Sequence, residues 1–169
     1  MKTQFNVLFL CTGNSARSQI AEAIANQIGK DRLRAFSAGS QPAAAVHPGT
    51  LEVLQAVGFP TAQLHTKSWS QFAQADAPEM DFIITLCNRA AGEPCPTWPG
   101  HPITAHWSVP DPAAEGFTPQ QSREAFRQAM HVLQQRISLM LALRLEALDR
   151  LATETRLSQI GQPQSTQNN

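Results

Sequence analysis

The sequence predicts an α/β fold, a single three-layer domain in which a four-stranded parallel sheet is flanked by helices. Short apolar runs alternate with longer segments of helical periodicity, and this alternation is typical of parallel strands joined by crossover helices. Capping residues, Pro and Gly stand where the helical segments begin and end. The 169 residues suit one domain, which buries about 70% of the surface that its unfolded chain exposes.

Four apolar runs have the length of strands and are bounded by turn or helix signals. The predicted strands are Asn6–Leu10, Leu33–Ser37, Asp81–Leu86 and Ile103–His106. The predicted helices begin near Ser15, at His47-Pro48 and at Thr118-Pro119, and a less regular helical piece spans Ser68 to Ala75. Gly29 and Gly58 are placed to end the first two helices. Stretches 39–46 and 93–102 are rich in Pro, Gly or Ala and are predicted to be loops.

The C-terminal helix is predicted to be unusually long. Thr118 is its N-cap, Pro119 occupies its first turn and Gln121 stands at the capping-box position. Apolar residues at helical spacing continue to Leu141, and the helix is extended by Leu145, Leu148 and Leu151. The extension covers either more of the core or a partner subunit. The domain is expected to span 1–157, and the polar residues 158–169 are expected to form a disordered tail.

Composition excludes several classes of partner. There are 13 basic and 13 acidic residues and no basic run, so neither nucleic acid nor an anionic membrane surface is an expected partner. No apolar stretch approaches 18 residues and no signal peptide is recognised, so a cytoplasmic location is expected. Three cysteines do not make a disulfide scaffold. The three cysteines are therefore interpreted as reactive thiols rather than as structural disulfides.

An oxyanion site is predicted where the first strand ends. The loop residues are Cys11, Thr12, Gly13, Asn14, Ser15, Ala16, Arg17 and Ser18. Gly and Asn tolerate positive φ, so successive backbone N–H groups can curl around an anion at the positive end of the following helix. Arg17 adds a planar fork of donors that suits a tetrahedral oxyanion. Cys11 is then the candidate nucleophile, and the alternative is an inert buried cysteine.

Chemistry at this loop also requires a reactive thiolate at Cys11 and a proton donor. The N–H groups of the loop, Arg17 and Ser18 are expected to lower the pKa of Cys11, so that the thiolate forms near neutral pH. Asp111 follows the last predicted strand and can face the same crevice, because loops after parallel strands share one edge of the sheet. We interpret Asp111 as the donor of a proton to a leaving oxygen; the alternative is that Asp111-Pro112 only forms a turn.

Cys87 and Cys95 are candidates for a thiol relay with Cys11. Cys87 ends the third predicted strand and should emerge at the same sheet edge as Cys11. The loop that follows contains Gly92 and Pro94, and it is long enough to bring Cys95 to Cys87 for thiol–disulfide exchange. Two alternatives stay open at this point. Cys87 and Cys95 are unrelated core residues, or they form a zinc site with His101 and His106.

These motifs resemble the arsenate reductases of the low-molecular-weight tyrosine phosphatase superfamily, of the thioredoxin-coupled type. The likeness covers roughly residues 5–140 and rests on CTGNSARSQIAEA at 11–23, SAGS at 37–40, TLC at 85–87, the Cys95-Pro96 loop and HWSVPDPA at 106–113. The loop at 11–18 is shared with the phosphatases. The two additional cysteines resemble a reductase, and the chain has no Tyr, so it lacks the tyrosines that follow Asp-Pro in the phosphatases.

The resemblance implies a four-stranded parallel sheet and the reduction of arsenate to arsenite in arsenic detoxification. It implies that Cys11 attacks arsenic and that Asp111 protonates the departing oxygen. Cys87 then attacks Cys11 and releases arsenite, and Cys95 attacks Cys87, so that the disulfide moves to a loop. The implied reductant is thioredoxin, or glutathione with glutaredoxin, and no cofactor is implied. A low-molecular-weight protein tyrosine phosphatase with the same loop is the alternative function, and weak phosphatase activity is compatible with either.

Some members of this superfamily bind potassium near the loop. Asn14, Glu22 and Ser37 match part of that site, but Lys67 stands in the segment where an Asp is expected. No metal ion is therefore predicted for this chain, and Lys67 can supply a positive charge there instead.

Overall fold

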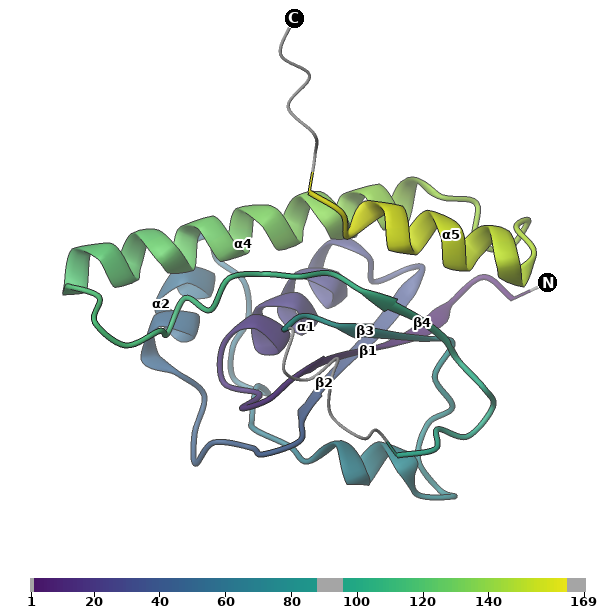
Figure 1. The fold of residues 1–169 in the computed structure, drawn as a ribbon, viewed down its shortest axis with the longest axis horizontal. Helices are drawn as coiled ribbons and strands as arrows, with labels where there is room; N and C mark the ends of the chain where they lie inside the picture. Colours follow the sequence, from purple (N-terminus) through teal and green to yellow (C-terminus); the bar gives the residue numbers. More distant parts are fainter. Residues whose placement is uncertain (1, 88–95, 164–169) are drawn as a thin grey trace, which may run out of the picture.

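The computed structural model describes residues 2–87 and 96–163, and its centre is a parallel sheet of four strands (Figure 1). The strands are β1 (Phe5–Cys11), β2 (Leu33–Gly39), β3 (Phe82–Thr85) and β4 (Ile103–His106). Their order is β2-β1-β3-β4, and every neighbouring pair is parallel. The chain leaves β1 toward one side of the sheet and returns to β3 on the other. The crevice at the carboxyl ends of β1 and β3 is therefore the expected ligand site.

Helices cover one face of the sheet, and a short 3-10 helix lies over the other (Figure 1). The elements are α1 (Arg17–Ile28), α2 (Pro48–Ala56), η1 (Trp69–Ala73), α4 (Pro119–Ala142) and α5 (Arg150–Ile160). Side chains of β1 alternate between the two faces, so that Val7 and Phe9 belong to the core beneath the long helices, whereas Leu8 and Leu10 belong to the core beneath η1. The predicted three-layer α/β fold is confirmed. No helix in the described part of the chain is both long and apolar enough to cross a membrane.

Most of the predicted elements are present with small changes of boundary. All four strands form, and β3 is one residue shorter at each end than predicted. The first helix begins at Arg17 rather than near Ser15, because residues 12–16 form the loop that follows β1. The capping box of α4 is formed, since Thr118 Oγ1 accepts from Gln121 N–H at 3.1 Å and Gln121 Oε1 accepts from Thr118 N–H at 2.9 Å.

The predicted continuation of the long helix through Leu151 is wrong. Helix α4 ends at Ala142, and the Arg32 guanidinium binds the carbonyl oxygens of Leu141 and Leu143 at this end. The chain then turns, and the Asp149 carboxylate caps α5 by accepting from Ala152 N–H at 2.8 Å. Two helices form because a basic side chain from another part of the chain binds the terminal carbonyl groups of α4.

Helix α5 returns along α4 and closes the core at β4 (Figure 1). Trp107, which is fully buried, donates from Nε1 to the Leu157 carbonyl at 2.9 Å, and the Leu157 side chain is also fully buried. Leu145 is buried in the turn, whereas Leu151 is 74% exposed. Residues 158–160, which were expected to lie in the tail, belong to α5, and 164–169 lie outside the described residues.

We expect Leu157→Ala to destabilise the protein by about 2–5 kcal/mol, because it removes a fully buried side chain that joins α5 to the core. Leu151→Ala is the matched control on the same helix, and it should change stability by less than about 0.5 kcal/mol because its side chain is exposed. Urea unfolding followed by tryptophan fluorescence measures both. Equal effects of the two substitutions would show that α5 is not docked as described.

Candidate active site

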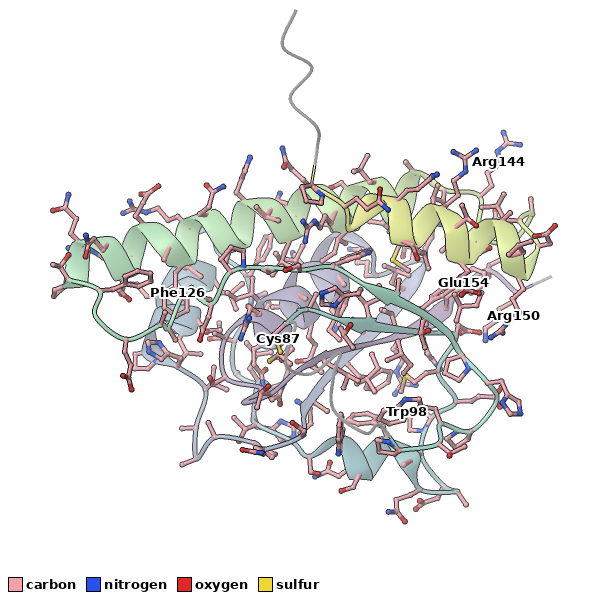
Figure 2. The ribbon with its side chains drawn as sticks, viewed as in Figure 1. Cys87, Trp98, Phe126, Arg144, Arg150 and Glu154 are labelled. Atoms are coloured by element: carbon pink, nitrogen blue, oxygen red, sulfur yellow. The ribbon has the colours of Figure 1, made fainter. Side chains whose placement is uncertain are left out.

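The carboxyl ends of β1 and β3 bring two thiols together. Leu10 pairs with Thr85 in the register of these strands, so Cys11 and Cys87 both follow at the same edge of the sheet. Their side chains contact each other and are 3% and 5% exposed. Figure 2 shows Cys87 near the middle of the molecule, beneath the long helices. The two cysteines border a cavity of about 620 Å³ that is also lined by the loop after β1 and by residues 108–113.

The loop after β1 is held from outside through its carbonyl oxygens. The Thr12, Gly13 and Ser15 carbonyl groups bind the segment 41–50, which follows β2 and enters α2, whereas the Asn14 carbonyl accepts from Gln19 Nε2 at 3.0 Å. Gln41 N–H donates to Thr12 O at 3.0 Å, Ala43 N–H to Gly13 O at 2.9 Å, and both His47 N–H and Thr50 Oγ1 to Ser15 O at 3.0 and 2.8 Å. Because these carbonyl groups are turned away from the cavity, the loop can direct N–H groups inward. Backbone N–H groups of Asn14 and Ser18 are directed at the Cys11 sulfur.

Asn14 is the residue that shapes the loop. It has a φ of 49° and is fully buried, so the positive φ predicted for this turn is adopted by Asn14. Its Oδ1 accepts from Lys67 N–H at 2.8 Å and from Gln19 Nε2 at 3.1 Å, which leaves Nδ2 to donate to Ser18 Oγ at 2.8 Å. Ser18 Oγ in turn lies 2.8 Å from Cys11 Sγ. Since the amide occupies one lone pair of the hydroxyl, its proton is available to the Cys11 thiolate.

The pKa of Cys11 differs from the prediction. Burial raises the pKa of this thiol above its ordinary value, and that effect outweighs the lowering effects of the Ser18 hydrogen bonds, the Arg17 charge and the Asn14 N–H. The residues expected to stabilise the thiolate are in place, but they do not compensate for the loss of water around the sulfur. The expectation of a lowered pKa for Cys11 is therefore wrong.

Arg17 and Asp111 meet at the rim of the cavity. Arg17 begins α1, its side chain is 15% exposed, and Nη1 donates to the Val109 carbonyl at 3.1 Å. Nη2 lies 4.0 Å from Asp111 Oδ2, and Asp111 Oδ1 accepts from Ala113 N–H at 2.9 Å. The Asp111 side chain is 47% exposed. The structure thus places Asp111 on the same cavity as Cys11, as predicted from the shared edge of the parallel strands, and its carboxyl group is accessible to solvent.

Thr12 connects the loop to the second thiol, since its Oγ1 lies 3.5 Å from Cys87 Sγ. Cys95, the third thiol of the predicted relay, lies outside the described residues. The alternative zinc site included Cys95 as well. Within residues 2–87 and 96–163, no three His, Cys, Asp or Glu side chains are clustered so that they could hold a metal ion.

Lys67 occupies the position near Glu22 and Ser37 that the sequence singled out. Its Nζ lies 3.8 Å from Glu22 Oε1 and 3.5 Å from Ser37 Oγ, and both charged side chains are buried. Burial lowers the pKa of Lys67 and raises the pKa of Glu22, while each charge acts in the opposite direction on its partner. Gln19, which binds both Asn14 and the His65 carbonyl, was not predicted as a site residue. Its sequence signal was a glutamine beside the apolar residues that open α1.

Family comparison agrees with this arrangement. The family model described as "Low molecular weight phosphotyrosine protein phosphatase" matches residues 6–154. The chain belongs to this family. The match includes the loop after β1, both described cysteines and the Asp111 loop, and it ends within α5.

Several similar proteins are arsenate reductases. An arsenate reductase of Halalkalibacterium halodurans is 31% identical over 131 residues, which are 78% of this chain and 91% of that protein. A solved structure titled "An arsenate reductase in the phosphate binding state" has a TM-score of 0.67 and 28% identity, over 82% of this chain and 98% of that one. A thioredoxin-dependent arsenate reductase of Corynebacterium glutamicum has a TM-score of 0.53 and 28% identity, over 80% of this chain and 63% of that one.

We expect Gly39→Ala to weaken oxyanion binding strongly. A Cβ at Gly39 would collide with the Thr12 carbonyl oxygen and lie 3.0 Å from Asn14 N, so the loop must move. Gly13→Ala is the control within the loop, because its Cβ would meet only Ser15 Oγ, at an ordinary 3.6 Å. Calorimetric titration with phosphate should show at least about tenfold weaker binding for Gly39→Ala, a loss of about 1.4 kcal/mol. Equal affinity of the two variants would contradict this packing.

The reactivity of Cys11 should rise steeply with pH. In a Cys87→Ser/Cys95→Ser background, Cys11 is the sole thiol of the chain, so the rate of alkylation by iodoacetamide reports its thiolate. Because burial raises the pKa, the midpoint should lie above that of a free cysteine. Adding Ser18→Ala should move the midpoint higher still, since the Ser18 hydroxyl lowers the pKa. A midpoint below that of free cysteine would overturn the assignment of burial as the dominant effect.

Proposed function

We propose that this protein is an arsenate reductase that converts arsenate to arsenite with three thiols, in arsenic detoxification. The observation that carries the proposal is the contact between the buried thiols of Cys11, in the loop after β1, and Cys87, which follows β3 beside that loop. A single nucleophilic thiol is enough to transfer a phosphoryl group, whereas reducing arsenic requires two electrons, which a pair of thiols supplies when it forms a disulfide. The arsenate reductases among the relatives support the same reaction.

In the first step the loop holds arsenate with its N–H groups and with Arg17. The Cys11 thiolate attacks arsenic, a sulfur–arsenic bond forms and one arsenic–oxygen bond breaks. Asp111 donates a proton to the departing oxygen, which leaves as water. Asp111 lies at the rim of the cavity, with Oδ2 4.0 Å from Arg17 Nη2 and its side chain 47% exposed, so the carboxyl group is in contact with solvent. The relative in its phosphate-binding state supports binding of a tetrahedral oxyanion in this fold.

In the second step the Cys87 thiolate attacks Cys11 Sγ. A Cys11–Cys87 disulfide forms, and the electron pair of the sulfur–arsenic bond passes to arsenic, which is reduced from the pentavalent to the trivalent state and leaves as arsenite. The contact between the two side chains means that this attack needs no large movement of β1 or β3. Thr12 Oγ1, 3.5 Å from Cys87 Sγ, can donate to the Cys87 thiolate.

In the third step Cys95 restores the nucleophile. Its thiolate attacks the Cys87 sulfur, Cys11 leaves as a thiolate, and a Cys87–Cys95 disulfide remains. A dithiol reductant then returns both sulfurs to thiols, so two electrons from the reductant balance the two given to arsenic. Thioredoxin is the reductant that the relative from Corynebacterium glutamicum supports, and glutathione with glutaredoxin is the alternative.

Phosphotyrosine hydrolysis is the second candidate function. The family description names phosphatases, and the same loop, Arg17 and Asp111 can transfer a phosphoryl group through Cys11. This reaction does not use Cys87. The place of Cys87 against Cys11 therefore favours the reductase.

We expect Cys87→Ser to abolish arsenate-dependent oxidation of reduced thioredoxin or glutaredoxin, because no second thiol remains to break the sulfur–arsenic bond. Slow hydrolysis of p-nitrophenyl phosphate should persist, since it requires Cys11, Arg17 and Asp111 but not Cys87. Coupled NADPH consumption and nitrophenolate release measure the two activities. Cys11→Ser is the control that should remove both.

Peptide mass mapping after one turnover without reductant tests the order of transfer. A Cys87–Cys95 disulfide that forms with arsenate but not with phosphate supports the proposal. Normal arsenate turnover by Cys87→Ser, or robust phosphotyrosine hydrolysis by the wild type without arsenate turnover, would contradict it.

A further inference from the structure

The Lys67 ammonium group is buried beside the oxyanion loop, yet Lys67 does not line the cavity. Its Nζ donates to the His65 carbonyl at 2.7 Å and lies near Glu22 of α1 and Ser37 of β2. Removing an ammonium group from water is costly unless it is paired and hydrogen-bonded. These partners satisfy that condition, and they attach segment 65–67 to a helix and a strand at once.

Segment 65–67 also contacts the loop and its neighbours through its main chain. Lys67 N–H donates to Asn14 Oδ1 at 2.8 Å, and the His65 carbonyl accepts from Gln19 Nε2 at 2.7 Å. The Lys67 carbonyl accepts from Gly39 N–H at 2.9 Å. The buried ammonium therefore holds the backbone that orients the Asn14 amide.

From Lys67 a continuous series of hydrogen bonds leads to the nucleophile. Lys67 N–H binds Asn14 Oδ1, Asn14 Nδ2 binds Ser18 Oγ, and Ser18 Oγ binds Cys11 Sγ, each at 2.8 Å. We propose that Lys67 is a positioning residue whose buried ammonium fixes segment 65–67, and through Asn14 and Ser18 keeps the loop ready for the oxyanion and Cys11 ready to attack.

Positioning of the loop by Lys67 can be distinguished from stabilisation of the fold by the Lys67–Glu22 ion pair. If the pair only stabilised the fold, replacing both charges with neutral groups would restore the loop along with stability, because no unpaired buried charge would remain. If the ammonium positions the loop, the double substitution restores stability but not reactivity. In that case the His65 carbonyl and Ser37 still lack the group that holds them together.

The test compares Lys67→Met with Lys30→Met, a control at an exposed lysine beyond α1. Both are made in the Cys87→Ser/Cys95→Ser background, and Cys11 alkylation by iodoacetamide is measured at one fixed pH, with and without phosphate. We expect Lys67→Met to slow alkylation about tenfold, as the loss of a hydrogen bond to a charged sulfur does. Phosphate should protect Cys11 at least about tenfold less well, while Lys30→Met matches the parent.

Two further variants separate positioning from folding. Lys67→Met/Glu22→Gln should recover the parent's melting temperature but retain slow alkylation. Lys67→Ala should regain alkylation rate when propylammonium, which replaces the missing part of the side chain, is added, but not when bulky choline is added at the same ionic strength. Parental alkylation and phosphate protection in the double variant, well below its melting temperature, would overturn the proposal, as would equal effects of propylammonium and choline.

Only the expected effect of Lys67 on arsenate turnover rests on the proposed function. In the three-cysteine protein, Lys67→Met should raise KM for arsenate and lower kcat, because both binding and attack depend on the loop. The alkylation experiment involves neither arsenate nor a reductant. A wild type that fails to reduce arsenate would therefore refute the proposed function, and the alkylation rates alone would still decide the role of Lys67.

Discussion

The site depends on the hydrogen bonds that hold Asn14 with positive φ. A loop that turns several N–H groups toward an anion must turn its carbonyl groups the other way, and each carbonyl then needs a donor. Segment 41–50 supplies the donors for Thr12, Gly13 and Ser15, and Gln19 supplies the donor for the Asn14 carbonyl. Lys67 N–H and Gln19 also bind the Asn14 side-chain amide. The loop is therefore shaped by residues far from it in the chain, and its geometry exists only when β2, α2 and segment 65–67 are all in place.

Burial of the site has one unfavourable and one favourable effect on its chemistry. The same exclusion of water that raises the pKa of Cys11 also strengthens the attraction between a bound oxyanion, the loop and Arg17. The two buried thiols are also in contact with each other. In the proposed reaction this contact matters more than an easily formed thiolate, because the second thiol must reach Cys11 before water reaches the arsenic adduct.

Local signals explain which parts of the fold were predictable. Four apolar runs gave four strands, and the capping box at Thr118 marked the start of α4 correctly, since both depend on neighbouring residues alone. The end of α4 was missed because leucines 145–151 keep a helical spacing, whereas the carbonyl groups at Leu141 and Leu143 are bound by Arg32, more than one hundred positions away. The direction of the pKa shift of Cys11 was missed for a similar reason, because a loop motif does not show how deeply the thiol is buried.

By itself the sequence determined the chemical inventory of the proposed site: a candidate oxyanion loop after an apolar strand, a candidate nucleophilic thiol with an arginine six positions later, and two further cysteines. Residue type and spacing are sufficient for this, because hydrogen-bond donors and sulfur nucleophiles belong to side chains and short turns. Only the tertiary structure decided that Cys87 touches Cys11, that Asp111 shares their cavity and that Lys67 supports Asn14. Those relations depend on strand register, crossover direction and burial, which arise when segments distant in the chain pack together.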